Sequence, residues 1–256
     1  MPSIFITGGA AGIGLATAER FAREGWKVGV YDVDQAALAA VKSEHPDWIV
    51  GELDVREPQQ WADALAEFAS HTGGTLDVLD NNAGVLVAGD LDEISTGAIK
   101  AQIDIDVLGV TYGAQAALPY LKATPGAHLV NIASASAIYG QPGIATYSAA
   151  KFYVAGLTEA LELEWEKHDV RVVGIWPLWA KTSLADNEAK STKTLGVNIT
   201  PEQVADKVWQ SVHPTALDRR IHRTSYSVGL QTLLLGNLSK FSPNFATRLV
   251  NKYLAQ

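Results

Sequence analysis

The stretch IFITGGAAGIG at residues 4–14 decides the fold, because a short apolar run leads directly into a glycine-rich turn. The run IFIT predicts a β-strand, and apolar residues at helical spacing from Gly14 to Gly25 predict a helix that ends at a glycine. Glycines at such a turn let the backbone approach a pyrophosphate, to which the helix presents its free N–H groups. Ordinary βα turns can also be rich in glycine, so the turn by itself only favours a nucleotide site.

The rest of the chain repeats this alternation of strand and helix. Such alternation is typical of a parallel sheet with helices on both faces. No Pro/Gly-rich linker or change of composition divides the chain. The sequence therefore predicts a single α/β domain over residues 1–256, with a Rossmann-type, doubly wound parallel sheet. Further strands are expected within 27–32, 48–54, 75–84, 128–134 and 170–176, and the longest helices at about 98–121 and 145–168.

Composition and charge exclude several classes of function. With 47% hydrophobic and 19% charged residues, the chain of 256 residues can bury a sizeable core. Its net charge of −8 argues against nucleic acid as a partner and against a polybasic patch for anionic lipid. Without cysteine there are no disulfides, thiolate nucleophiles or thiolate metal ligands, and the six histidines form no ligand cluster, so we expect no metal. No apolar run is long enough for a membrane span and no secretory signal is visible, so we expect a cytoplasmic protein.

Asp32 indicates which dinucleotide the glycine turn would bind. It ends the second strand, 18 residues beyond Gly14, where a carboxylate can accept hydrogen bonds from the adenosine ribose hydroxyls. A carboxylate there also repels the 2′-phosphate of NADP, and no Arg or Lys at 9–11 or 33–36 offsets that charge. The sequence therefore favours NAD. Without the glycine turn, a solvated carboxylate at a strand end would be the better interpretation.

Four motifs in this order together resemble the short-chain dehydrogenase/reductase family. They are TGGAAGIG at 7–14, NNAG at 81–84, Ser134, and YSAAK at 147–151, with an interval of 13 residues from the serine to the tyrosine. The segment PLWAKT at 177–182 resembles the family's segment after the sixth strand. The resemblance implies a sheet of seven strands and hydride transfer between a nicotinamide and an alcohol or carbonyl.

The chemistry of three residues fits that reaction. Oxidation of an alcohol needs a base for the hydroxyl proton, and Tyr147 can serve only if its pKa falls well below about 10. Lys151 lies four residues on, on the same helix face, where an ammonium favours the phenolate. Ser134, at a strand end, can hold the substrate oxygen in line. Each residue alone has an ordinary structural explanation; their joint pattern predicts the catalytic group.

The resemblance also implies binding roles. Asp54 and Val55 match the pair beside the adenine, the NNAG turn lies beside the adenosine ribose, Lys151 holds the nicotinamide ribose, and Thr182 binds the carboxamide. The full set of expected NAD-binding residues is Gly8, Ala11, Gly12, Ile13, Gly14, Asp32, Val33, Asp54, Val55, Asn82, Ala83, Gly84, Tyr147, Lys151, Pro177 and Thr182.

Two positions depart from the family pattern. Asp106, in DVLG at 106–109, stands where the family has a catalytic Asn that helps to place a water near the lysine. An ionised Asp106 would raise the pKa of Lys151 and oppose the phenolate of Tyr147, so we expect oxidation to need a higher pH than in an Asp106→Asn variant. Alternatively, the backbone carbonyl holds the water and the side chain matters little. Leu178 stands where the family's segment usually has a glycine, and we expect its bulkier side chain to narrow the nicotinamide side of the cleft.

The substrate is expected to be a neutral, hydrophobic secondary alcohol or its ketone. Apart from the catalytic residues, the expected wall is mostly apolar and has no Arg or Lys for an anionic group. A substrate loop is expected at about 183–200, and a C-terminal helical extension at about 225–256 with a helix that starts at Ser242-Pro243. The expected substrate-binding residues are Ser134, Tyr139, Tyr147 and Trp179.

The remaining expectations concern assembly and rival functions. A homodimer or homotetramer follows only from the resemblance, through the helices at about 98–121 and 145–168. Two alternatives stay open. A reductase of carrier-bound 3-oxoacyl chains would prefer NADPH and a basic docking patch, which Asp32 and the net charge disfavour. A non-catalytic NAD-binding protein that kept the fold is supported only by Asp106.

Overall fold

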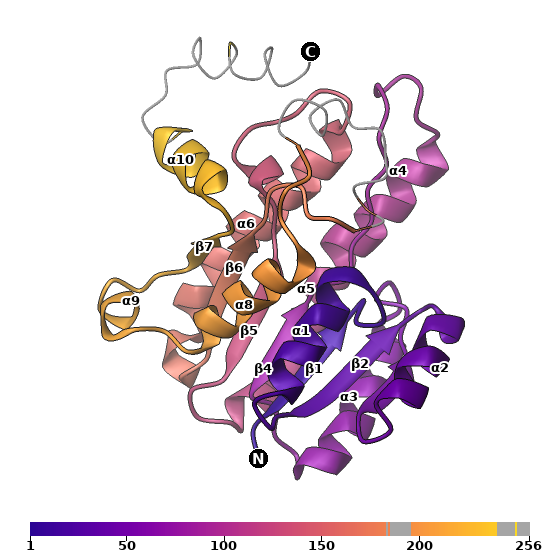
Figure 1. The fold of residues 1–256 in the computed structure, drawn as a ribbon, viewed down its shortest axis with the longest axis vertical. Coiled ribbons are helices and arrows are strands. Elements are labelled where there is room, and N and C mark those ends of the chain that lie inside the picture. The colour runs from indigo at the N-terminus through magenta and orange to yellow at the C-terminus, as the bar shows by residue number, and fades with distance from the viewer. Residues whose placement is uncertain (183, 185–195, 240–248, 250–256) are drawn as a thin grey trace.

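Seven strands form one sheet in the structure, a computed structural model that describes residues 1–182, 184, 196–239 and 249. The strand order is β3-β2-β1-β4-β5-β6-β7, and each neighbouring pair is parallel. This confirms the predicted Rossmann-type, doubly wound sheet (Figure 1). The strands are β1 (Ser3–Thr7), β2 (Lys27–Asp32), β3 (Ile49–Glu52), β4 (Val78–Asn81), β5 (His128–Ile132), β6 (Arg171–Trp176) and β7 (Ser225–Ser227).

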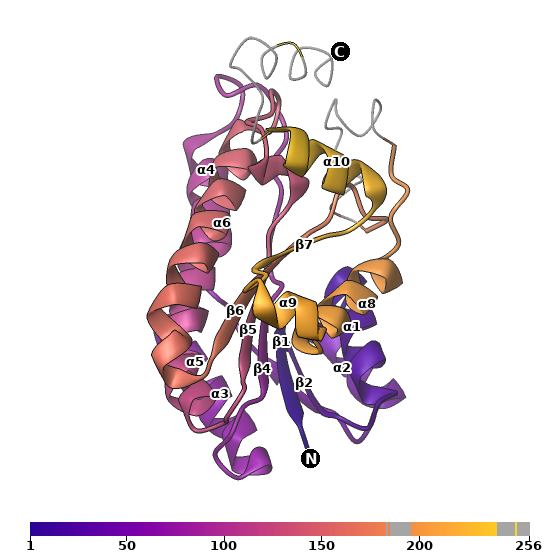
Figure 2. The same ribbon diagram turned by 90° about the vertical axis from the view of Figure 1, so that its left-hand side faces the viewer.

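Helices cover both faces of the sheet. Side chains of α1, α2 and α8 join one hydrophobic core, and those of α3, α5 and α6 join the other (Figure 2). Among the described residues, none of the helices has the length and apolar character to cross a membrane. The helices are α1 (Gly12–Ala22), α2 (Gln35–Glu44), α3 (Pro58–Thr72), α4 (Thr96–Ile103), α5 (Val110–Lys122), α6 (Ala145–Trp165), α8 (Pro201–Val212), α9 (Ala216–Arg220) and α10 (Leu230–Ser239).

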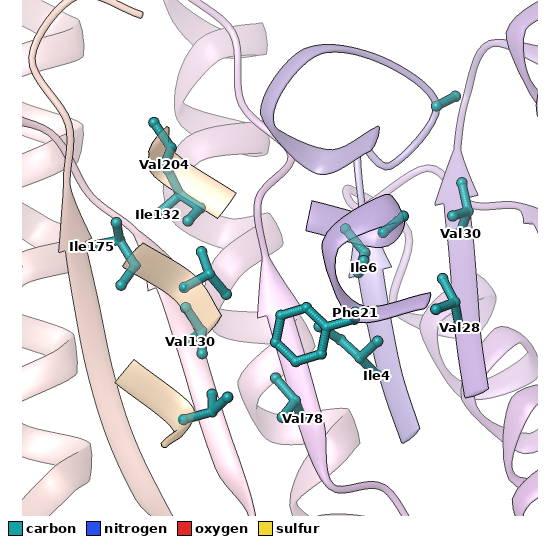
Figure 3. Packing of buried hydrophobic residues seen from close by; sticks show 14 of the residues in the cluster. Ile4, Ile6, Phe21, Val28, Val30, Val78, Val130, Ile132, Ile175 and Val204 are labelled. Carbon is teal, nitrogen blue, oxygen red and sulfur yellow. The ribbon is translucent and has the colours of Figure 1, made fainter. Parts of the chain in front are cut away.

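The two cores share strand β1, because successive side chains of a strand point to opposite faces. Ile4 and Ile6 face α1, where they pack with Phe21 (Figure 3). Phe5 faces the other core and stacks on Tyr31 with ring centres 4.1 Å apart. All five side chains are buried, and full burial of a large apolar side chain stabilises the fold by about 1.5–3 kcal/mol. The apolar stretch that predicts β1 is thus the centre of the molecule.

Strand β1 also fixes where a ligand can bind. It lies between β2 and β4 in the sheet. From β1 the chain continues to strands on one side of the sheet, and from β4 to strands on the other side. The strand order therefore reverses between the carboxyl ends of β1 and β4. Open α/β sheets bind ligands in the crevice at such a switch point. The glycine turn after β1 and the NNAG turn after β4 therefore meet at the place expected for a nucleotide.

The prediction of a helical extension at about 225–256 is wrong for its first residues. Ser225–Ser227 forms β7, the seventh strand, which pairs with Gly174–Trp176 of β6. Two serines flank the buried Tyr226, so the strand has no apolar run to mark it in the sequence. It forms because it covers the edge of β6, which would otherwise be unpaired. Helix α10 follows, and the helix start predicted at Ser242-Pro243 lies outside the described residues.

Only the two ends of the predicted substrate loop at about 183–200 are described. Ile199 forms a bridge with Ala180 and accepts a backbone hydrogen bond from Lys181, at 2.8 Å. Thr200 then caps α8, with a reciprocal hydrogen bond between its backbone N–H and Gln203. The loop is therefore held at both ends beside the carboxyl edge of β6. Residues 183 and 185–195 lie outside the described part of the chain.

Candidate active site

The turn after β1 requires glycine at two positions because other backbone lies against it. Gly8 has φ +60°, and a Cβ there would lie 2.9 Å from Ala83 Cα. A Cβ on Gly14 would lie 2.3 Å from the Gly8 carbonyl oxygen. At the start of α1, the N-cap residue Ala11 offers no side-chain hydrogen bond to the free N–H groups. This cradle, with its uncapped helix end, fits a pyrophosphate.

Asp32 is held against the same turn. Its carboxylate accepts hydrogen bonds from the backbone N–H groups of Ala10, at 3.2 Å, and Val33, at 2.8 Å. These contacts fix the carboxylate at the end of β2, on the wall of a cavity of about 400 Å³. A ribose hydroxyl placed there would find an acceptor, and a phosphate placed there would meet a negative charge.

The NNAG turn after β4 is joined to the glycine turn by hydrogen bonds. The Asn82 side-chain amide donates to the carbonyl oxygens of Thr7, at 2.8 Å, and Gly8, at 3.0 Å. The Thr7 hydroxyl in turn accepts from the backbone N–H groups of Asn82 and Ala83. Most of the predicted NAD-binding residues line the one cavity that results: Gly8, Ala11, Gly12, Ile13, Asp32, Val33, Asp54, Val55, Asn82, Ala83, Gly84 and Thr182.

Arg56 is a feature of this cavity that the sequence analysis missed. Its guanidinium forms an ion pair with Asp54, with a shortest N···O distance of 2.5 Å, and this pairing holds the pKa of Asp54 below its ordinary value. Arg56 is the one cationic residue among the described residues that line the cavity, and its charge is matched by its own neighbour. The sequence shows the two residues two positions apart, but not that both line the same cavity as Asp32.

Ser134, Tyr147 and Lys151 line a second pocket next to this cavity. Tyr147 and Lys151 are both buried on one face of α6, and Lys151 Nζ lies 5.5 Å from the centre of the Tyr147 ring. Lys151 also donates to the carbonyl oxygen of Ile132, at 3.0 Å. Ser134 follows β5, where its hydroxyl accepts a hydrogen bond from the backbone N–H of Ser136. Helix α6 and strand β5 thus bring the predicted catalytic side chains together.

Burial dominates the electrostatics of this pocket. It raises the pKa of Tyr147 above the ordinary value, Asp106 raises it further, and a hydrogen bond with Ser134 lowers it. Burial lowers the pKa of Lys151, while Asp106 raises it. A phenolate at Tyr147 therefore needs more positive charge than the protein itself supplies, and an oxidised nicotinamide bound beside it would add such charge.

Asp106 lies in an irregular turn of the predicted long helix. Between α4 and α5 the chain forms a π-helical turn, Asp104–Gly109, a feature that occurs frequently at functional sites. Asp106 is fully buried and accepts a hydrogen bond from the backbone N–H of Val85, at 2.9 Å, while its other carboxylate oxygen has no partner among the described residues. The side chain therefore anchors the irregular segment that follows the NNAG turn.

Asp106 also lies close to Lys151. A Cβ placed on Gly84 would be 3.2 Å from Asp106 Oδ1 and 3.6 Å from Lys151 Nζ, so both groups border the same small space. Burial raises the pKa of Asp106 to about 6, and Lys151 opposes that rise. Near neutral pH the carboxylate is thus mostly ionised, and Asp106 is not among the residues that line either pocket.

The remaining predicted residues fall in different places. Pro177 and Trp179 line the pocket of the catalytic residues, and so does Leu178, in place of the family's glycine. Tyr139 is buried but is not among the residues that line this pocket. Gly14 lies beneath the glycine turn and not on the cavity wall. Ser136, which no pattern in the sequence singles out, lines the pocket with its hydroxyl 3.2 Å from that of Ser134.

Comparison with known proteins agrees with this geometry. The family model described as short chain dehydrogenase matches residues 2–193. The 2,5-dichloro-2,5-cyclohexadiene-1,4-diol dehydrogenase of Sphingobium indicum is 32% identical over 186 residues, which cover 71% of this chain and 74% of that protein. The 3-alpha-(or 20-beta)-hydroxysteroid dehydrogenase of Mycobacterium tuberculosis is 32% identical over 184 residues, which cover 71% and 70%.

Solved structures share the fold. The crystal structure of a short chain dehydrogenase from Burkholderia cenocepacia in complex with NADP aligns with a TM-score of 0.82 and covers 98% of this chain and 97% of that chain. The two sequences are 21% identical, so this likeness concerns the fold alone. The arrangement of sheet and helices is thus one that solved members of this class adopt.

Proposed function

The chain belongs to the short-chain dehydrogenase family of oxidoreductases, and on that premise we propose that it interconverts a hydrophobic secondary alcohol and its ketone with NAD. The observation that carries the proposal is the meeting of Ser134, Tyr147 and Lys151 in one pocket beside the glycine cradle. Any two of these features could occur in a protein without this activity. Their occurrence together supports an acid–base group beside a dinucleotide site.

In the proposed reaction Tyr147 takes the hydroxyl proton of the alcohol, or returns it to the ketone. When bound, the nicotinamide supplies the hydride acceptor or donor. Ser134 holds the substrate oxygen by a hydrogen bond and is itself fixed by the N–H of Ser136. Lys151, buried below Tyr147, contributes positive charge that favours the phenolate, and such positioned acid–base groups contribute about 10²–10⁴-fold to a rate.

The preference for NAD rests on Asp32. Its carboxylate is held by the N–H groups of Ala10 and Val33 at the end of β2, where the adenosine ribose of a dinucleotide lies in such folds. Arg56 could offset its charge, but Arg56 is paired with Asp54. A 2′-phosphate would therefore meet an unbalanced negative charge.

The apolar pocket supports a neutral, hydrophobic substrate. Its lining includes Trp179, Leu178 and Leu184, and its only cation among the described residues is Lys151, which serves the catalytic group. An anionic substrate would find no basic partner there. The two relatives are named for hydroxyl-bearing substrates, which agrees with an alcohol as the substrate class.

We also infer that the protein forms a homodimer or homotetramer. Leu108, Phe152 and Tyr153 are large apolar side chains with more than a third of their surface exposed, on the π turn and on α6. Exposed apolar groups at neighbouring positions are typical of contacts between subunits. Light scattering on the purified protein tests this: a monomeric mass would contradict it.

The proposed function is tested by a Tyr147→Phe variant, which keeps the ring but loses the proton carrier. Turnover should fall at least about a hundredfold, while the affinity for NAD, measured by calorimetry, should change little. Ser134→Ala should lose turnover in the same way. If the Phe variant oxidised alcohols at the wild-type rate, Tyr147 would not be the acid–base group, and the proposal would be wrong.

A further inference from the structure

The C-terminal part of the chain has basic residues but no acidic ones. The last acidic residue is Asp218, so all 28 Asp and Glu lie at or before it. Residues 219–256 contain no Asp or Glu, although the whole chain has a net charge of −8. The net charge thus conceals a basic C-terminal part. Its basic residues are Arg219, Arg220, Arg223, Lys240, Arg248 and Lys252.

Large apolar side chains are exposed in the same part of the molecule. On α10, Leu230 is 70% exposed and Leu234 is 53% exposed; at α9, Leu217 is 64% and Ile221 is 58% exposed. Both helices lie on the side of the molecule that faces the viewer in Figure 2. We define the α9–α10 face by its exposed residues, which are Leu217, Arg219, Arg220, Ile221, Leu230, Leu233 and Leu234.

A groove connects the two helices of this face. The groove is a cavity of about 570 Å³, lined by Ile221 and Arg223 on one side and by Leu233 of α10 on another. Arg223 is tied to Asp218 by an ion pair of 3.1 Å, so Arg219 and Arg220 provide the charge that α9 presents to the solvent. The α9–α10 face therefore combines exposed leucines at α10 with exposed apolar and basic side chains at α9, on either side of the groove.

From this combination we propose that the α9–α10 face docks on a membrane surface that contains anionic lipids. Exposed leucines of an amphipathic surface enter the boundary between headgroups and acyl chains, and arginines beside them attract anionic headgroups. Docking on such a surface needs both exposed apolar side chains and positive charge, and α10 and α9 supply them. The protein would lie on the membrane and not span it.

Charge favours this occupant over a second copy of the chain. A symmetric contact through the α9–α10 face would bring Arg219 and Arg220 of each copy towards the same residues of the other, and like charges repel. Carboxylates do lie beside the face, because Glu159 of α6 and Glu166, directly after α6, line cavities that also include His222. Glu159 lines the groove itself, opposite in charge to the arginines of α9.

The face lies next to the catalytic segment. Helix α10 packs on the 3₁₀ turn Ala135–Ala137, which directly follows Ser134, and a Cβ on Gly236 would lie 3.7 Å from Ile138 Cδ1. If the face docks on a membrane, the active site lies close to the lipid, in which a hydrophobic alcohol dissolves. The docking itself does not depend on the proposed function.

The test is co-sedimentation of the full-length protein with lipid vesicles. Vesicles of phosphatidylcholine alone are compared with equimolar phosphatidylcholine and phosphatidylglycerol, at low and at high salt. Wild-type protein should bind the anionic vesicles at least about tenfold more tightly than the neutral ones, and salt should weaken this binding. Absence of binding to both kinds of vesicle, or equal binding to both, would overturn the proposal.

Two double variants and their matched controls assign the binding to the face. R219E/R220E and L230S/L234S should each lose at least about tenfold in affinity for anionic vesicles, whereas the controls R23E/K122E and L91S should not. Melting temperatures verify that each variant is folded. If R219E/R220E bound like the wild type, the proposal would fail. If it changed the oligomeric state and left vesicle binding unchanged, the face would belong to a second copy instead.

Discussion

Asp106 shows how one residue can serve the fold and disturb the chemistry. Its carboxylate holds the backbone of Val85 and so fixes the irregular segment after the NNAG turn, a role that an asparagine oxygen would fill equally well. An asparagine would not supply the negative charge of Asp106, which raises the pKa of Tyr147 and of Lys151. The carboxylate therefore works against the phenolate that the proposed oxidation needs.

The Asp106→Asn variant separates the two roles. It keeps the acceptor for Val85 but removes the charge, so the pKa of Tyr147 should fall and the rise of kcat/KM for alcohol oxidation should move to lower pH, by about one pH unit. The measurement is the pH profile of kcat/KM for both proteins, with Asp104→Asn in the same π turn as a control. Superimposable profiles would show that the side chain has no influence on Tyr147.

Asp80 is a second buried carboxyl, in β4, that the proposed mechanism does not use. Its neighbours in the sheet are Ile6 and Val130, both in the apolar core under α1 and α8, and neither of its oxygens has a partner among the described residues. Burial raises the pKa of Asp80 to about 8. The folded protein thus keeps this carboxyl protonated at neutral pH, whereas the unfolded chain ionises it near pH 4.

The consequence is a pH-dependent cost in stability. Between about pH 4 and pH 8 the folded state binds a proton that the unfolded state releases, so stability falls as the pH rises. Asp80→Val should therefore raise the free energy of unfolding by roughly 2–4 kcal/mol at pH 7 and by much less at pH 4.5. Urea unfolding at both pH values measures this, and an equal gain at the two would contradict the account.

At the scale of elements, the turn between β1 and α1 is the most constrained part of the structure. Gly14→Ala would place a methyl group 2.3 Å from the Gly8 carbonyl oxygen, which cannot move without disturbing the cradle. We expect a loss of about 1–3 kcal/mol in stability and weaker binding of NAD. The matched control is Gly156→Ala, on an exposed position of α6 with nothing within 4 Å, where about 0.5–1 kcal/mol should be gained. Equal effects at both positions, measured by thermal unfolding and calorimetry, would show that the turn is not constrained.

The elements also show which features a sequence reveals. Strand β1 and helix α6 carry long, regular patterns, so their positions and the pairing of Tyr147 with Lys151 could be predicted. Strand β7 has three residues with one buried tyrosine, and the π turn around Asp106 changes the hydrogen bonding within a continuous helix. Neither alters the spacing of apolar residues in the sequence, so neither could be predicted from it.

For the whole molecule, contacts between distant segments decide the site. The motifs predict which residues meet, because each family motif has a known place at the switch point of the sheet. They do not predict the ion pair of Arg56 with Asp54 beside Asp32, or the exposed leucines of α10, because both depend on how loops and helices pack. Net charge likewise does not reveal that residues 219–256 carry basic residues but no Asp or Glu.

The preference between NAD and NADP depends on the charged residues that line the cavity beside the glycine turn. Asp32→Ala removes the carboxylate that would face a 2′-phosphate, and the charged residues that then line the cavity are the paired Asp54 and Arg56. The ratio of the dissociation constants for NADP and NAD should therefore fall at least about tenfold. Titration calorimetry measures it, and Asp47→Ala, an exposed position before β3, is the control. An unchanged ratio would mean that Asp32 does not select the cofactor.

The most direct test of the central claim is the initial rate of cofactor reduction when wild-type protein is mixed with hydrophobic secondary alcohols and either NAD or NADP. The account predicts NADH formation with at least one alcohol, a much slower rate with NADP, and no rate above background for Tyr147→Phe. Binding of NAD without turnover of any alcohol or ketone over a wide pH range would contradict it, and faster turnover with NADP would contradict the role of Asp32.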